Sequence, residues 1–334
     1  MKIAILSPVA WRTPPRHYGP WEQMASNLAE GLIARGADVT LFATGDSLTQ
    51  GKLAWTCPQG YEEDRHADAK VNECMHISYL MEQAHHFDII HNHFDFLPLT
   101  YSRLIGTPMV TTIHGFSSEK IVPVYQRYNH VGHYVAISNA NRHPSLHYKA
   151  TIYNGVRPED FAFTPAPDDY LLYYGRIHPD KGTYDAIQIA LQTNRQLLIA
   201  GIIQQKEYFD EMVRPYIDDD QIRYLGPVGG AARSELLGRA SALLHPIHFD
   251  EPFGLSVAEA MLCGTPVIAF NRGSMPELIQ DGRTGFLVHT VNDAVAAVES
   301  LKQIDRYACH LHAQENFTTG RMTEDYLKVY RSIG

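Results

Sequence analysis

Two glutamates in one short stretch of the chain are placed to bind a polar ligand together. In HFDEPFGLSVAEAMLCGTPVIA, Glu251 precedes a Pro-Phe-Gly turn, and Glu259 follows after seven intervening residues. Residues 254–262 have the composition of a helix, and Gly264 stands where a C-terminal glycine cap is expected. The sequence therefore predicts one carboxylate in the turn before a helix and a second carboxylate within that helix.

The start of this helix would also offer backbone donors. The free N–H groups of Phe253, Gly254 and Leu255 form a site for phosphate or for sugar hydroxyls. Glu259 lies about 1.4 turns beyond Gly254, so it can face the same ligand. Carboxylates bond strongly to the paired hydroxyls of a ribose or a hexose. In the alternative interpretation, Glu251 is only a charge at the helix N-terminus and Glu259 faces solvent, but the apolar neighbours of Glu259 favour burial.

A pair of cations could complete such a site. In YGRIHPDKG, residues 174–182, a strand end delivers Arg176 and, five residues later, Lys181. Arginine offers a bidentate fork and lysine a point charge, and together they can neutralise a diphosphate. On spacing alone, an ordinary solvated loop fits these residues equally well.

Composition and missing motifs exclude several function classes. A net charge of −9 over 334 residues argues against a general nucleic-acid binder. The chain lacks Gly-x-Gly-x-x-Gly after its first strand, and it lacks Gly-x-x-x-x-Gly-Lys-Ser/Thr, which argues against dinucleotide oxidoreductases and P-loop hydrolases. Four scattered cysteines indicate neither a zinc site nor a disulfide framework and favour the cytoplasm. No apolar run suits a secretory signal or a transmembrane helix, although peripheral membrane contact stays open.

The length predicts two domains, and the first is a series of strands and helices. A strand at 2–6, a helix over 21–33 and a strand at 37–43 form a βαβ unit, which implies a parallel sheet. Further strands are expected at 87–93, 107–115, 133–138 and 150–155. Because ligands gather at the carboxyl ends of parallel strands, these residues form one candidate rim: Ser7, His91, His93, His114, Ser138 and Asn154.

A second series follows a proline-rich linker over residues 154–169. Its strands are expected at 170–177, 195–201, 222–226, 242–247, 265–270 and 285–288, with helices between them. The predicted fold class is α/β, with an N-terminal domain over 1–157 and a C-terminal domain over 158–317. The last segment, about 318–334, has a helical pattern and could pack back on the first domain.

The order of these motifs resembles the retaining nucleotide-sugar glycosyltransferases of family 4, which have the GT-B fold. YGRIHPDKG, LLHPIHFDEPFGLSVAEAMLCGTPVIAF and RGSMPELIQDGRTGFLV occur in the family's order, as do HYGPWEQMASNLAEGLIARGADVTLFATGDS, FDIIHNH, TTIHG, AISNA and YNGV. The likeness covers nearly the whole chain, and its most specific element is the glutamate pair of EPFGLSVAE. It implies two doubly wound Rossmann-like domains that face each other across a cleft.

The resemblance also implies an activity. A hexosyl group would pass from a UDP- or GDP-sugar in the C-terminal domain to a hydroxyl of a sugar, glycoside or lipid-linked acceptor in the N-terminal domain, with retention of configuration. No metal or other cofactor would be needed, because an Arg–Lys pair takes the electrostatic place of the metal at the leaving group. A sugar-nucleotide epimerase or hydrolase, or a non-catalytic carbohydrate- or nucleotide-sugar-binding protein, is the alternative.

Roles for individual residues follow from the positions that match the family's motifs. His114 and Glu251 are the catalytic candidates that the resemblance implies. The resemblance further implies that Arg176, Lys181 and Gly19 contact the donor diphosphate and that Glu259 contacts the ribose. It also implies that Glu251 contacts the transferred sugar together with the main chain of Phe253, Gly254 and Leu255.

The loop around Gly19 departs from the family's pattern. Many relatives carry two glycines before the glutamate, whereas Gly19 is followed here by Pro20 and Trp21. Trp21 fits the apolar stripe of the following helix, and we interpret it as a core residue. The candidate acceptor-side residues, chosen for their polarity and position, are Arg12, Arg16, His17, His91 and His93.

Several histidines other than His114 are interpreted from their positions in the chain. His91 and His93 have a spacing that a metal could use, but the sequence offers no apparent third ligand, and no metal site is expected. One of the two is expected to have an acceptor-side role and the other a structural one. Four further histidines are expected at the surface: His85, His86, His310 and His312.

Overall fold

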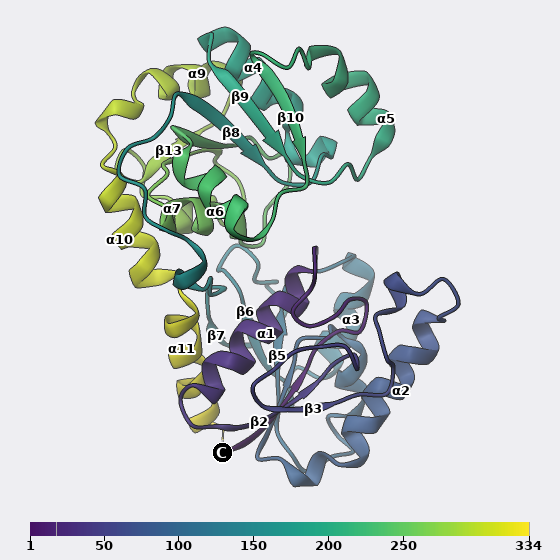
Figure 1. Cartoon of the computed structure of the whole chain (residues 1–334). Coiled ribbons are helices and arrows are strands. Elements are labelled where there is room, and N and C mark those ends of the chain that lie inside the picture. The colour runs from purple at the N-terminus through teal and green to yellow at the C-terminus, as the bar shows by residue number, and fades with distance from the viewer. Residues whose placement is uncertain (18, 334) are drawn as a thin grey trace. The chain divides into compact units, whose positions relative to one another are not determined.

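The computed structural model describes residues 1–17 and 19–333. The chain divides into two compact units, each built around its own parallel sheet (Figure 1). Unit 1 contains residues 1–155 together with 319–334, and unit 2 contains Val156–Thr318. The last segment of the chain therefore belongs to the same unit as the first.

Unit 1 is built on a seven-stranded sheet in the order β3-β2-β1-β4-β5-β6-β7, in which every neighbouring pair is parallel. Ile3 of the central strand lies opposite Val39 on one side and Ile89 on the other. The central strands are apolar along most of their length, as expected for a sheet covered on both faces. The strands are β1 (Lys2–Leu6), β2 (Asp38–Phe42), β3 (Lys52–Ala54), β4 (Ile89–Asn92), β5 (Met109–Ile113), β6 (His133–Ala136) and β7 (Tyr148–Thr151).

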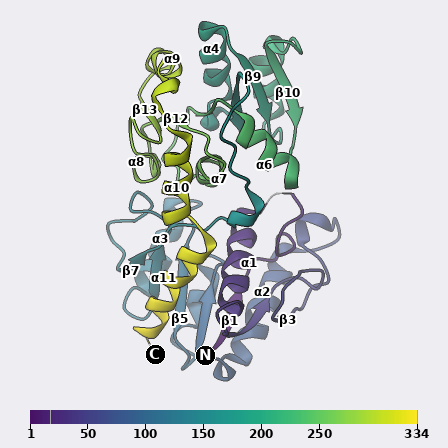
Figure 2. The same ribbon diagram turned by 60° about the vertical axis from the view of Figure 1, so that its left-hand side comes forward.

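Helix α1 (Pro20–Ile33) packs on β1 and β2 and lies beside the C-terminal helix α11 (Thr319–Arg331), as Figure 2 shows. Pro20 occupies the first turn, where the backbone N–H that proline lacks would have no partner within the helix. Gly31 lets α11 approach closely, because a Cβ there would lie 2.2 Å from Thr323 Oγ1. The other α-helices of unit 1 are α2 (Ala69–Glu82) and α3 (Val122–Arg127).

Unit 2 is built on a six-stranded parallel sheet in the order β10-β9-β8-β11-β12-β13. Its strands are β8 (Tyr170–Tyr174), β9 (Gln196–Ala200), β10 (Ile222–Gly226), β11 (Ala242–His245), β12 (Val267–Phe270) and β13 (Gly285–Val288). Its α-helices are α4 (Thr183–Thr193), α5 (Lys206–Tyr208), α6 (Gly230–Arg239), α7 (Leu255–Leu262), α8 (Met275–Leu278), α9 (Val291–Glu299) and α10 (Arg306–Asn316). Apolar side chains of β8, β9, α4 and α9 form the core on one side of this sheet.

Each strand that the sequence predicts is present, whereas one strand and two α-helices of unit 1 were not predicted. These are β3, a three-residue edge strand with no buried residue, α2, which lacks a strong apolar stripe, and the six-residue helix α3. None of the described helices has the length and apolar character needed to cross a membrane. Both sheets are parallel throughout, so within each unit the loops at the carboxyl ends of the strands are where candidate residues are expected.

Candidate functional site

The loop after β8 brings a lysine to the end of β11. A short turn, Pro179–Lys181, leads from β8 into α4. Gly182 joins the turn to the helix with a φ of +69°, and a Cβ there would lie 1.8 Å from the carbonyl oxygen of Pro246. Because only glycine suits both this conformation and this contact, the backbone itself holds Lys181 beside the segment that follows β11.

Lys181 and Glu251 form a buried ion pair. Lys181 Nζ donates to Glu251 Oε2, and each side chain is only 13% exposed. His245 Nε2 lies 3.7 Å from the same carboxylate oxygen. Burial opposes ionisation of Glu251, but His245 and the Lys181 charge outweigh burial and lower the pKa of Glu251 to about 2. At neutral pH Glu251 is therefore a carboxylate that can only accept hydrogen bonds.

His245 stands beside this pair as a neutral imidazole. Burial lowers its pKa, although the neighbouring Glu251 acts in the opposite direction. The 3.7 Å separation from Glu251 exceeds a hydrogen-bond length, and His245 Nε2 has no hydrogen-bond partner among the described residues. A buried ring nitrogen without a partner is rare, and here it faces the Glu251 carboxylate at the end of β11.

Glu259 is buried on α7, so the solvent-facing alternative is wrong. Its exposed fraction is 8%, and Arg233 Nη1 of α6 lies 3.3 Å from its Oε1. The guanidinium also lies 4.9 Å from the centre of the Phe161 ring. Burial raises the pKa of Glu259 to about 7, although the Arg233 charge acts in the opposite direction. The two glutamates therefore differ in protonation, because Glu259 is only partly ionised at neutral pH.

The turn between the two glutamates is fixed by the segment after β12. Gly254 is the N-cap of α7 with a φ of +91°, and Phe253 before it is buried. Ser274 donates its Oγ hydrogen to the Phe253 carbonyl (2.7 Å) and its backbone N–H to the Glu251 carbonyl (3.0 Å). Helix α7 begins at Leu255, so Glu259 lies one turn into the helix, as predicted.

Arg176 has a different partner from Lys181. Its guanidinium donates to the side-chain oxygen of Gln204, and its carbonyl accepts a hydrogen bond from Tyr173 Oη (2.8 Å). Arg176 is half-buried on the same loop as Lys181. The loop thus presents two fixed cations, one held by an amide and one by a carboxylate.

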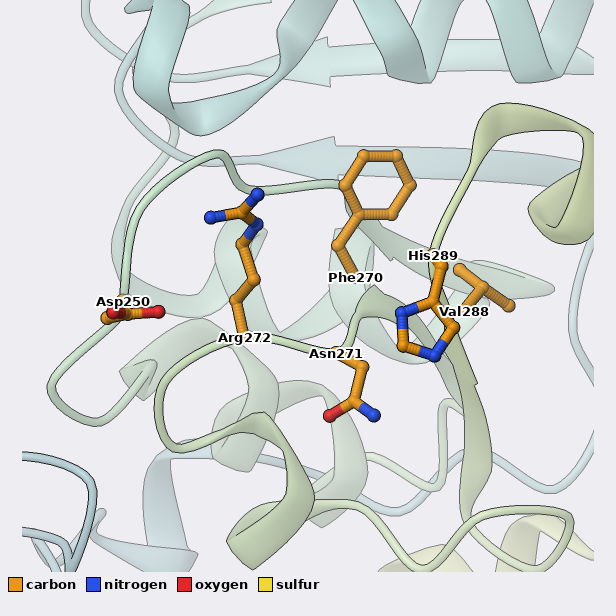
Figure 3. A pocket seen from close by; sticks show the side chains of 6 residues that line it. All are labelled: Asp250, Phe270, Asn271, Arg272, Val288 and His289. Atoms are coloured by element: carbon orange, nitrogen blue, oxygen red, sulfur yellow. The ribbon is translucent and has the colours of Figure 1, made fainter.

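A cavity of about 320 Å³ lies beside the turn, at the carboxyl ends of β12 and β13. Figure 3 shows the Arg272 side chain between Asp250 and the Phe270 ring. Asn271 and His289 also line the cavity. Among the described residues that line the cavity, none is a predicted donor contact, and Asp250 is only the chain neighbour of Glu251. We therefore give this cavity no role in the donor site.

Unit 1 contains a column of four stacked rings. Trp21 stacks on His114 with ring centres 5.5 Å apart, His114 on His93 at 5.2 Å, and His93 on His91 at 4.3 Å. His93 Nδ1 and His114 Nε2 share a hydrogen bond of 2.9 Å. Burial lowers the pKa of all three histidines, so they are neutral at pH 7. Within the described chain, His93 Nε2 has no hydrogen-bond partner.

His91 is the most tightly held of the three histidines. Its Nδ1 is bonded to Tyr330 Oη of α11, and its Nε2 lies 2.7 Å from Thr112 Oγ1. Thr112 in turn shares a 2.6 Å hydrogen bond with Tyr326 Oη. Both ring nitrogens of His91 are therefore used inside unit 1, and His93 is the histidine that contacts the catalytic candidate His114.

The first loop places the other acceptor-side candidates apart from this column. Arg16 pairs with Asp46 and with Glu63, both at 3.0 Å, and Arg12 donates to the carbonyl of Pro14 at 3.0 Å. These side chains are thus held by their own unit. His17 lies at the surface, and Gly19 is the buried N-cap of α1.

Two interpretations from the sequence are wrong. Trp21 is half-buried and lines a cavity instead of the core, and its ring stacks on His114. His310 and His312 are half-buried, since each bonds a backbone carbonyl, of Leu262 at 2.5 Å and of Leu278 at 2.9 Å respectively. His85 and His86 are exposed, as expected.

Metal ligands are not gathered anywhere in residues 1–17 and 19–333, where no three His, Cys, Asp or Glu side chains are grouped to hold an ion. The four cysteines, all in the described part of the chain, are free thiols.

Two family models match the chain and together span most of it. The model described as glycosyl transferases group 1 matches residues 157–309, and the model described as Glycosyltransferase Family 4 matches residues 22–160. The chain belongs to these glycosyltransferases. Among solved structures, Anabaena HepE in complex with UDP and glucose has a TM-score of 0.76 at 20% identity, over 99% of this chain and 100% of that chain. The glycosyltransferase has the GT-B fold.

Two relatives in sequence match the chain over different shares of its length. Glycogen synthase from Mycobacterium tuberculosis is 25% identical over 342 residues, covering 83% of this chain and 80% of the relative. Trehalose synthase from Pyrococcus horikoshii is 31% identical over 177 residues, covering 48% of this chain and 43% of the relative. The glycosyltransferase thus matches less than half the length of the trehalose synthase, and these relatives leave its donor and acceptor open.

Three polar residues beside the predicted donor contacts were missed from the sequence. His245 could have been found, since it ends β11 and the same rim rule that selected other strand ends applies to it. Arg233 and Gln204 carried no signal, because each reaches its partner across a distance of 26 or more residues in the chain (Arg233 to Glu259, Gln204 to Arg176).

Proposed function

We propose that this glycosyltransferase moves a hexosyl group from a UDP- or GDP-sugar to a hydroxyl acceptor, with retention of configuration and without a metal. The observation that carries the proposal is the buried Lys181–Glu251 pair at the N-terminus of α7. A cation and an ionised carboxylate at one helix start suit a ligand that has both phosphate and hydroxyl groups. Unit 2 would bind the donor, and unit 1 would bind the acceptor.

In unit 2 each predicted contact has a physical basis. Lys181 and Arg176 supply positive charge for the diphosphate, and the N-terminus of α7 adds backbone donors. Glu251 accepts hydrogen bonds from hydroxyls of the transferred sugar, because its low pKa keeps it ionised. Glu259 accepts from the ribose hydroxyls, and a ligand that donates to a carboxylate favours its ionised form.

The transfer needs no protein nucleophile in this scheme. The bond between the anomeric carbon and the diphosphate oxygen breaks, and the acceptor oxygen bonds to the same carbon from the same face. The departing diphosphate takes the proton of the acceptor hydroxyl. Lys181 and Arg176 stabilise the charge that develops on the leaving oxygen, which is the role a metal ion has in other enzymes. His114 would contact the donor sugar at the reaction centre.

UDP is the first nucleotide to test, because the Anabaena HepE structure contains UDP and glucose. Thermal melting with UDP, GDP, ADP and their sugar conjugates would identify the base, since a ligand that binds the folded state raises the melting temperature. Release of nucleotide is then followed with and without sugar acceptors. Nucleotide release that depends on an acceptor supports transfer, whereas release of free sugar at the same rate without one would favour the hydrolase.

The role of Glu251 is tested by Glu251→Gln, with Glu207→Gln at an exposed position of unit 2 as the matched control. Loss of one preorganised hydrogen-bonding group at a reaction centre typically lowers turnover by about 10²- to 10³-fold. Chelation with EDTA should leave turnover of the wild type unchanged. Full activity of a folded Glu251→Gln variant would remove Glu251 from the donor site, and loss of activity in EDTA would remove the metal-free mechanism.

A further inference from the structure

A second cavity, of about 460 Å³, lies wholly within unit 1. The loops after β1 and β4, the start of α1 and the side of α2 enclose it. Its volume is in the range of sites for small molecules. Trp21, which stacks on the catalytic candidate His114, lines it, so the cavity adjoins the histidine column.

Aromatic rings make up much of its wall: Trp11, Trp21, Tyr61, Phe94 and Phe96. Trp11 and Trp21 are only half-buried, although large apolar side chains are usually covered. A flat aromatic face that is open to a cavity suits the C–H face of a sugar ring, which is apolar and weakly positive.

Three carboxylates complete the wall: Glu22, Glu73 and Asp95. Glu73 accepts a hydrogen bond from Tyr61 Oη at 3.2 Å, and Asp95 accepts one from Tyr125 Oη. Burial raises the pKa of Glu22 to about 7 and that of Asp95 to about 6, against opposing hydrogen bonds, and it also raises the pKa of Glu73. Carboxyl groups accept hydrogen bonds from hydroxyls, and in their ionised form they repel a further negative charge.

Asp95 is held in an unusual backbone conformation at this wall. Its φ is +99°, which is rare for a residue other than glycine. The side-chain amide of Asn92 donates to its carbonyl at 2.8 Å, while the Asn92 side-chain oxygen accepts from the N–H of Phe94 at 2.8 Å. Strained residues that their surroundings hold in place are concentrated at binding sites.

Positive charge is missing from this wall. Of the described residues that line the cavity, none is Lys, Arg or His. The nearest basic residues in sequence, Arg12 and Arg16, bond to Pro14 and to Asp46 and Glu63 instead. A phosphate or carboxylate on a ligand would therefore meet three carboxyl groups without a counter-charge.

We propose that this cavity is the acceptor subsite and that it takes a sugar ring without phosphate or carboxylate groups. This inference rests on the proposed function, which places the acceptor in unit 1. In this proposal the aromatic rings stack on the apolar face of the sugar ring. The three carboxyl groups accept hydrogen bonds from the hydroxyls of the sugar. It also excludes sugar phosphates as acceptors.

Binding to the cavity can be measured without turnover. The chain has three tryptophans, of which Trp11 and Trp21 line the cavity and Trp55 is 51% exposed elsewhere in unit 1. A Trp55→Phe variant therefore reports the cavity by fluorescence. It is titrated with matched pairs, glucose against glucose 6-phosphate and mannose against mannose 6-phosphate. The same pairs are then offered as acceptors to the wild type with a sugar nucleotide.

We expect at least one free sugar to bind about tenfold or more tightly than its phosphate ester, since one like charge typically shifts such an equilibrium by that factor. Glu73→Gln should narrow this gap severalfold, whereas Glu82→Gln, at an exposed position of the same helix, should leave it unchanged. Esters that bind or react as well as the free sugars, or the absence of binding by every sugar, would overturn the proposal.

The two proposals can fail separately. Selective binding of free sugars without any turnover of sugar nucleotides would leave the sugar subsite and remove the transfer reaction. Acceptor-dependent turnover with equal use of phosphate esters would leave the transfer reaction and remove the charge-based selectivity.

Discussion

The Lys181–Glu251 pair offers a quantitative test of the donor side, through the variant Lys181→Met. The pKa of Glu251 falls from an ordinary 4.5 to about 2 in the folded protein. Since one pKa unit corresponds to about 1.4 kcal/mol, ionised Glu251 contributes about 3 kcal/mol to stability at neutral pH. His245 supplies part of this effect, so we expect Lys181→Met to cost about 2 kcal/mol.

The pH dependence follows from the sign of the shift. In the wild type the contribution of Glu251 is complete above its unfolded pKa and is lost only as the pH falls from about 4.5 towards 2. Without Lys181 the buried carboxylate loses its cation, and its pKa rises. The difference in unfolding free energy between wild type and Lys181→Met should therefore shrink from pH 7 to pH 4, where the variant can bind a proton and the wild type still does not.

The assay is urea denaturation at both pH values, followed by far-ultraviolet circular dichroism. All three tryptophans, Trp11, Trp21 and Trp55, lie in unit 1, so tryptophan fluorescence reports that unit separately. Lys206→Met is the matched control, because Lys206 pairs with Asp210 on the exposed surface of unit 2. Such a surface pair is worth less than about 1 kcal/mol.

A second variant separates the pair from simple loss of a side chain. In a Glu251→Gln background no charge is left for Lys181 to compensate, so Lys181→Met should cost much less there than in the wild type. The reasoning is refuted if Lys181→Met costs the same at pH 7 and pH 4 and the same in both backgrounds.

Two further predictions concern unit 2. Gly182→Ala should destabilise the chain more than Gly226→Ala. Both glycines have a positive φ, +69° and +74°, but only at Gly182 would the new Cβ meet a backbone atom. In denaturation we expect Gly226→Ala to lower the free energy of unfolding by about 1 kcal/mol and Gly182→Ala to lower it further, with loss of activity. Affinity for the sugar nucleotide should fall by up to about tenfold per pH unit below about 7, the pKa of Glu259, because ribose hydroxyls bond best to the ionised form that Arg233 faces. Calorimetric titration of the wild type and of Glu259→Gln at several pH values checks this prediction. Equal pH dependence of the affinity in both proteins would contradict it.

Much of the fold is visible in the sequence because it depends on local pattern. The apolar runs at 2–6 and 242–247 are buried strands in the structure, and the helix with Glu259 begins within one residue of its predicted start. A parallel sheet then places the ends of its strands together, so the rim residues could be chosen before the structure was known.

The remaining features depend on packing between distant segments. Arg233 and Glu259 lie on different helices, and nothing in the sequence of α6 indicates that its arginine faces a carboxylate. The apolar stripe of α1 predicted Trp21 as a core residue, because a stripe gives a direction but does not tell which of its residues border a cavity. The cavity of unit 1 was missed for a related reason: Glu22, Glu73 and Asp95 meet only after two strands and two helices have packed.

The position of α11 has a consequence for how the protein is made. Tyr326 and Tyr330 of this helix bond Thr112 and His91, so the interior of unit 1 includes residues that follow all of unit 2 in the sequence. A ribosome makes residues 1–155 first and then all of Val156–Thr318 before it reaches these tyrosines. Unit 1 is therefore begun first but completed only after every residue of unit 2 has been synthesised. The histidines of the proposed reaction centre acquire their full surroundings only at that stage.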